Sequence, residues 1–177
     1  MVMRMAAEWL TPVKASGVAS YLIAAAACAV TAARSADRRV VRLAAVLGAL
    51  DLVFLLDIAF DWRWKLYAQL RSGAMTHHWY NQRSGPQIAA LILIATVLIA
   101  AAVWLSRRFA AVRGSPVAIC GGVVSIGCWL TEVVSFHSTD AMLYRHAGPL
   151  LIVSFLWMLG CGMTAAGIWI AGTAAVT

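Results

Sequence analysis

Five long apolar runs are the feature of this sequence that most constrains its fold. They occupy residues 17–33, 40–60, 87–105, 117–136 and 149–172. A helix needs about 20 residues to cross roughly 30 Å of hydrocarbon, and each run approaches or exceeds that length. Lipid offers no partner to the edge of an open sheet. The sequence therefore predicts an all-α integral membrane protein, in which five transmembrane helices form a bundle within a single membrane domain.

The composition agrees with a membrane environment. Apolar residues make up 63% of the 177 positions and charged residues 12%, whereas soluble domains average about half and about a quarter. The net charge of +7 comes from basic residues that are spread over short loops and form no continuous patch, which argues against a nucleic-acid partner. We expect the partners to be the lipid bilayer and either other membrane subunits or a second copy of the chain.

The basic loops predict an orientation in the membrane. Arginines concentrate in residues 34–42 and 107–113, and short loops rich in arginine or lysine stay in the cytoplasm. We therefore expect a multi-pass protein of a bacterial-type inner membrane, with its N-terminus outside and its C-terminus in the cytoplasm. Residues 61–86 would form an outer loop. Part of this loop should be helical, because Trp62, Leu66 and Leu70 recur at four-residue spacing.

Asp51 lies near the middle of the second apolar run. A carboxylate at the centre of a bilayer costs roughly 2.5–3.5 kcal/mol on insertion scales, and no lysine or arginine lies in the central part of any predicted span. Two interpretations follow. Asp51 is either a neutral acid that fixes helix packing through a bonded hydroxyl, or a group that exchanges a proton or an ion. The candidate hydroxyls are those of Ser20, Thr96, Ser125 and Thr131.

Most other polar residues that could take part in chemistry belong to the predicted outer side. Acids at the ends of two spans and the residues of two outer loops would reach the same membrane surface there. The candidates for ligand binding or proton exchange, besides Asp51, are Asp57, Asp61, Trp79, Tyr80, Arg83, Glu132 and Arg145. The candidate metal ligands are His77, His78, His137 and Asp140.

Three kinds of site would use these side chains. A metal ion would bind imidazole and carboxylate groups, and His137 and Asp140 are spaced to share one helical turn. A quinone or another amphipathic ligand would need an aromatic slot beside an acid that exchanges protons. An ion-paired polar cap would only stabilise the fold, and it would match Arg63, Arg83 and Arg145 to Asp57, Asp61, Glu132 and Asp140. In each case we expect Asp57 and Glu132 to lie in one cluster, with Arg83 or Arg145 close enough to pair with an acid.

These patterns favour one function and leave two others open. The favoured function is an accessory or ligand-binding subunit with a polar site of histidines and carboxylates at the non-cytoplasmic surface. The first alternative is a small membrane enzyme or redox protein that uses this site with a metal ion or a quinone. The second is a proton- or ion-coupled carrier that uses Asp51. No residue pattern assigns a catalytic group.

Overall fold

The computed structural model describes residues 11–76 and 84–174. Five helices are long and apolar enough to cross a membrane: α2 (Pro12–Arg34), α3 (Arg38–Phe60), α5 (Ser84–Arg108), α6 (Ser115–Val134) and α8 (Ile152–Ala174). The shorter elements are α4 (Trp62–Thr76), α7 (His137–Leu143), β1 (His146–Ala147) and β2 (Leu150–Leu151). The predicted all-α, five-span membrane fold is confirmed. The partly helical loop predicted after the second span is confirmed as well, because α4 occupies much of it.

Polar caps explain why several helices are longer than the apolar runs. Thr11 caps α2, where its Oγ1 accepts the backbone N–H of Lys14 at 3.3 Å and Pro12 holds the first position. Asp37 caps α3 in the same way, and its carboxylate accepts the N–H of Arg39 at 2.7 Å. At the start of α8 the apolar run is longer than the helix, because Gly148, with a φ of 70°, turns the chain between β1 and β2.

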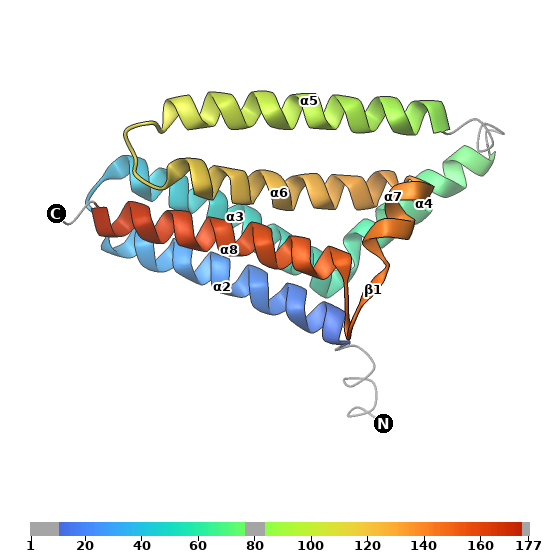
Figure 1. The fold of residues 1–177 in the computed structure, drawn as a ribbon, viewed down its shortest axis with the longest axis horizontal. Helices are drawn as coiled ribbons and strands as arrows, with labels where there is room; N and C mark the ends of the chain where they lie inside the picture. Colours follow the sequence, from blue (N-terminus) through green and yellow to red (C-terminus); the bar gives the residue numbers. More distant parts are fainter. Residues whose placement is uncertain (1–10, 77–83, 175–177) are drawn as a thin grey trace.

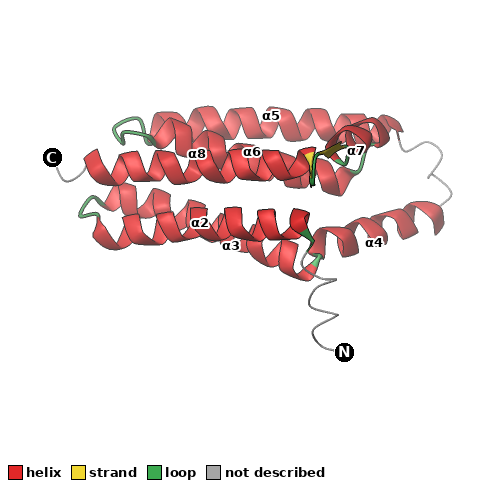
Figure 2. Cartoon of the chain, turned by 60° about the horizontal axis from the view of Figure 1, so that its bottom comes forward, coloured by secondary structure: helices red, strands yellow, loops and turns green. Residues whose placement is uncertain are grey.

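Four of the spanning helices form the bundle, and the fifth lies outside it. The α8 helix packs on α6 and α2, while α2 also packs on α3 (Figure 1). The α5 helix lies along the outer face of α6, and none of its residues is buried. The α2 helix begins at the end of the bundle where α3 and α6 finish, which we call the Thr11 end. The α4 helix extends away from the bundle at this end (Figure 2).

Small residues bring α6 and α8 close together. A Cβ atom on Gly121 would lie 2.5 Å from both the carbonyl oxygen of Gly160 and the backbone nitrogen of Thr164. Backbone atoms cannot move aside as a flexible side chain can, so this crossing requires a glycine. Close packing through small residues is a common way for helices to associate in lipid, where the hydrophobic effect does not hold them together.

We predict that Gly121→Ala destabilises the protein by about 1–3 kcal/mol, because the added methyl group forces the two helices apart. Thermal unfolding of the purified protein in detergent would measure the effect. Gly127→Ala is the matched control on the same helix, since its Cβ would only meet a leucine side-chain atom at 3.4 Å. Equal stability losses in the two variants would contradict the close α6–α8 crossing.

Candidate ligand-binding site

The site forms where the helix is interrupted between α3 and α4. Asp61 ends α3 in the left-handed conformation, with a φ of 55°, which aspartate tolerates better than most residues. The chain then enters α4, and Asp57 Oδ1 accepts the backbone N–H of Arg63 at 2.7 Å. A carboxylate at the first turn of a helix satisfies a free N–H group and interacts favourably with the helix dipole. Asp57 therefore caps α4 from one turn earlier in the chain.

The same interruption of the helix directs the Arg63 side chain into the protein. Its Nε donates to Asp57 Oδ2 at 2.7 Å, and its Nη1 donates to Glu132 Oε2 at 2.5 Å. The hydroxyl of Tyr144 donates to Glu132 Oε1 at 2.8 Å. The guanidinium carbon also lies 5.1 Å from the ring centre of Trp157, within the range of a cation–π interaction. One arginine thus connects α3, α4, α6 and α8.

This network is almost completely shielded from solvent. The exposed fraction of the side chain is 6% for Arg63 and 2% for both Asp57 and Glu132. Burial by itself would lower the pKa of Arg63, but Glu132 and Asp57 outweigh it and raise that pKa. Burial and the neighbouring Glu132 carboxylate also raise the pKa of Tyr144. The guanidinium therefore stays charged, and the phenol stays a hydrogen-bond donor.

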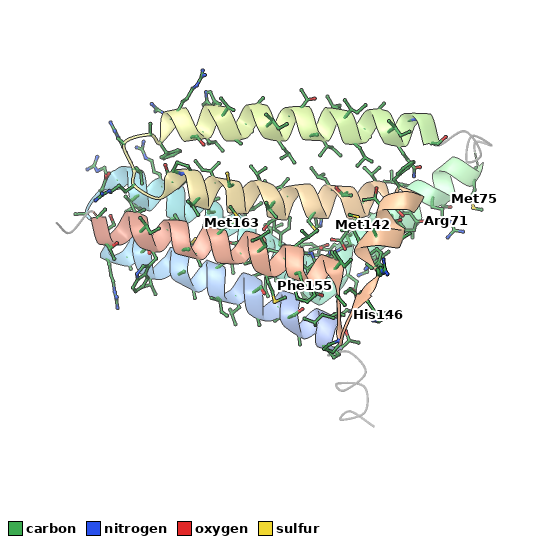
Figure 3. All side chains as sticks on the ribbon, viewed as in Figure 1. Arg71, Met75, Met142, His146, Phe155 and Met163 are labelled. Atoms are coloured by element: carbon green, nitrogen blue, oxygen red, sulfur yellow. The ribbon has the colours of Figure 1, made fainter. Side chains whose placement is uncertain are left out.

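A cavity of about 450 Å³ opens beside the network. Its polar lining consists of Thr11, Lys14, Asp61, Arg63, Glu132, Tyr144 and His146. The rest of the lining is largely apolar and includes Trp64, Trp157 and Leu151. Lys14 Nζ bonds to Asp61 Oδ2 at 2.6 Å, and both side chains are partly exposed, which places this ion pair at the mouth. Figure 3 shows His146 at the Thr11 end of the bundle. Such a mixture of apolar walls and a few convergent polar groups is typical of small-molecule sites.

The structure brings together some of the residues that the sequence nominated. Asp57 and Glu132 meet through Arg63, and Asp61 lines the adjoining cavity. Of the three arginines expected to pair with these acids, Arg63 pairs with both of them. Arg145 is exposed and forms no ion pair within the described residues, and Arg83 lies outside the described residues. The left-handed turn at the end of α3 explains why Arg63 reaches both acids, because it directs the Arg63 side chain toward the bundle.

Other nominated residues lie elsewhere or cannot be placed. Asp51 is inside the bundle and is not part of this network. Asp140 Oδ2 accepts a hydrogen bond from Ser135 Oγ at 2.5 Å. The side chain of His137 lies outside the part of the chain that the structure describes, as do His77, His78, Trp79, Tyr80 and Arg83. Among the described residues no three histidine, cysteine, aspartate or glutamate side chains are placed to hold a metal ion.

Several cavity residues were missed by sequence reasoning. Tyr144 lies four residues after Asp140, so its place in a polar loop was a usable signal. Lys14 lies just before the first apolar run, where a basic residue usually needs no explanation beyond the membrane surface. Trp157 had no signal at all, because a tryptophan inside an apolar run is equally suited to lipid.

The fold places this chain in the class of all-α, multi-pass membrane proteins. Comparison with protein-family models, with curated proteins and with solved structures finds no match to it. Any more specific function is therefore argued from the geometry of the Arg63 network and its cavity.

We predict that Arg63→Met destabilises the protein by about 3–5 kcal/mol, because it leaves two buried carboxylates without their cation. Thermal unfolding in detergent would measure the loss. Arg145→Met is the control: it removes an exposed arginine from the same end of the protein and should change stability by less than about 1 kcal/mol. A larger loss from Arg145→Met than from Arg63→Met would show that the acids pair differently in the folded protein.

Proposed function

We propose that this protein binds a small amphipathic molecule in the cavity at the Thr11 end of the bundle. The observation that carries the proposal is a cavity of about 450 Å³ with apolar and aromatic walls beside the ordered Arg63 network. Pockets for small molecules usually measure about 300–1,000 Å³ and combine these two kinds of lining. The protein acts as a ligand-binding membrane protein, whether alone or as a subunit of a larger assembly.

The Arg63 network indicates the chemistry of the ligand's head group. A guanidinium has five N–H donors, and the two acids take three hydrogen bonds from Arg63, of which one comes from its backbone. Side-chain donors of Arg63 are left for a ligand in the cavity that Arg63 lines. Because the acids hold the guanidinium in place, little entropy is lost when it donates to a ligand. The head group should therefore accept hydrogen bonds.

The walls of the cavity indicate the rest of the ligand. Trp64 and Trp157 offer flat aromatic surfaces, and Ile58 and Leu151 offer aliphatic ones. Planar rings stack favourably on aromatic side chains. A quinone combines hydrogen-bond-accepting carbonyl groups with a planar ring and an apolar tail, and it reaches such a site through the membrane. Quinones are therefore the ligand class that the cavity fits best.

We predict that decylubiquinone stabilises the purified protein in a saturable way, by about 2.7 kcal/mol at roughly 100 times its dissociation constant. Thermal unfolding and quenching of tryptophan fluorescence would measure binding, because two tryptophans line the cavity. Val13→Trp should abolish the effect, since Val13 lines the cavity and the larger side chain would fill it. Val117→Trp, at a partly exposed position on α6, is the control and should retain binding.

A cationic amphiphile separates this proposal from general detergent-like association. Dodecyltrimethylammonium has an apolar tail but no hydrogen-bond-accepting head group, so it should not compete with the quinone. No saturable stabilisation by decylubiquinone, or stabilisation that survives Val13→Trp, would refute the proposed site.

The proposed orientation puts the cavity on the non-cytoplasmic side of a bacterial-type inner membrane. Because the charge distribution favours arginine-rich loops in the cytoplasm, a cysteine replacing Ala147 should react with a membrane-impermeant thiol reagent in intact cells. A cysteine replacing Ser35 should react only after the cells are permeabilised. Both variants are made in a chain whose four native cysteines are replaced by serine or alanine. The reverse labelling pattern would place the cavity in the cytoplasm.

A further inference from the structure

Asp51 is a second buried acid, and the Arg63 network does not explain it. It lies in the middle of α3 with 1% of its surface exposed. Neither of its carboxylate oxygens has a hydrogen-bond partner among the described residues. By contrast, Asp57, Asp61 and Glu132 each pair with a basic side chain. Asp51 therefore differs from the other acids of the spanning helices and their ends in lacking both a cation and a donor within the described chain.

None of the four hydroxyls that could have made Asp51 a packing acid bonds to it. Ser20, Thr96 and Thr131 each donate to a carbonyl oxygen four residues earlier in their own helix, at 2.7 to 2.8 Å. Ser125 is buried and has no hydrogen bond to Asp51. The interpretation of Asp51 as a hydrogen-bonded structural acid therefore lacks the contact on which it depends.

The surroundings of Asp51 favour a bound proton. The α3 helix is covered by α2, α6 and α8, with α4 following it. Two buried thiols, Cys28 on α2 and Cys161 on α8, are near enough to Asp51 to interact with it electrostatically. No basic side chain of the described residues pairs with it. A carboxylate deprived of water, donors and cations is far less stable than a neutral carboxylic acid, so Asp51 holds a proton.

A polar connection leads from this region toward the cavity. Tyr21 on α2 is 2% exposed, and its ring packs on Phe54, with 5.5 Å between the ring centres. Tyr21 belongs to the same buried cluster as Cys161 and Trp157, and the Trp157 ring lies beside the Arg63 guanidinium. Because Phe54 lies about one turn after Asp51 on α3, Tyr21 lies between the level of Asp51 and the Arg63 network.

Two further ionisable groups, Cys128 and Glu132 on α6, lie at the cavity end of this connection. Cys128 on α6 belongs to the same buried cluster as Tyr21, and its Sγ lies 3.9 Å from Glu132 Oε2. Glu132 lines the cavity. A phenol can donate one hydrogen bond while it accepts another. Tyr21 can therefore receive a proton on one side as it releases its own on the other.

We propose that Asp51 is a proton-binding residue in the centre of the bundle and that it exchanges its proton with the cavity through the hydroxyl of Tyr21. Neither Asp51 oxygen is hydrogen-bonded to the Tyr21 hydroxyl in the structure, so the exchange requires a side-chain movement that brings the two groups together. Tyr21 then receives the Asp51 proton on its oxygen and releases its own proton toward Glu132 and the cavity. Tyr21 ends neutral, and the net result is the transfer of one proton. This inference concerns proton exchange, so it stands whether or not the cavity binds a quinone.

Infrared spectroscopy of the purified protein tests the proposal directly. Wild-type protein should show the carbonyl band of a protonated carboxylic acid that disappears in Asp51→Asn and persists in Asp37→Asn, which alters an exposed acid at the other end of α3. After transfer to D₂O the band should shift as the proton exchanges for deuterium. Tyr21→Phe should slow this shift at least tenfold, whereas Tyr67→Phe, at a partly buried tyrosine of α4, should not.

Each other outcome would overturn the proposal. A spectrum without a band assigned to Asp51 would mean that the residue is ionised. A band that never shifts in D₂O would mean a sealed packing acid, and equally fast exchange in Tyr21→Phe would exclude the tyrosine route. If Asp51→Asn fails to fold, ¹³C-labelled aspartate in the wild-type protein identifies the band, because the isotope shifts aspartate bands and leaves glutamate bands in place.

Discussion

The Arg63 guanidinium, held between Asp57 and Glu132, is the interaction on which the Thr11 end of the structure depends. Opposite charges attract strongly where water is excluded, and each becomes costly if its partner is removed. The arginine therefore restricts how α4 leaves α3 and where the end of α6 lies. Tyr144 and Trp157 complete the surroundings of the arginine and also form part of the cavity wall. The shape of the cavity follows from how this one charge is neutralised.

Two acids on α3 show how much position in the membrane matters. Asp51 and Asp57 are both 1% exposed. Asp57 lies near the end of its helix, where the following chain can supply a backbone N–H and a guanidinium. Asp51 lies nearly two turns deeper, where the neighbouring helices present thiols and apolar side chains. The same residue type thus organises structure in one place and is available to bind a proton in the other.

The helix α5 lies at the periphery of the bundle, and none of its residues lines the cavity. Its side chains are apolar around nearly the whole circumference, and none is buried, as expected of a helix surrounded largely by lipid. At its start, Gln87 Nε2 donates to the carbonyl oxygens of Val134 and Ser135, at 3.1 Å each. These contacts satisfy carbonyl groups left free at the end of α6. These hydrogen bonds connect the start of α5 to the end of α6.

The sequence by itself determined the number of spans, the helical segment after the second span, and the need of Asp57 and Glu132 for a cation. These features depend on the length of apolar runs and on the cost of a lone carboxylate in lipid, both of which are local properties. The tertiary structure alone decided which of the candidate arginines is that cation, that Trp157 and Lys14 line a cavity, and that no hydroxyl of the described residues bonds to Asp51. The physical reason is that a left-handed residue at Asp61 sets the direction of α4, and the packing of separate helices sets which side chains can reach one another. Neither the direction of α4 nor the packing of separate helices can be read from the residues adjacent in sequence alone.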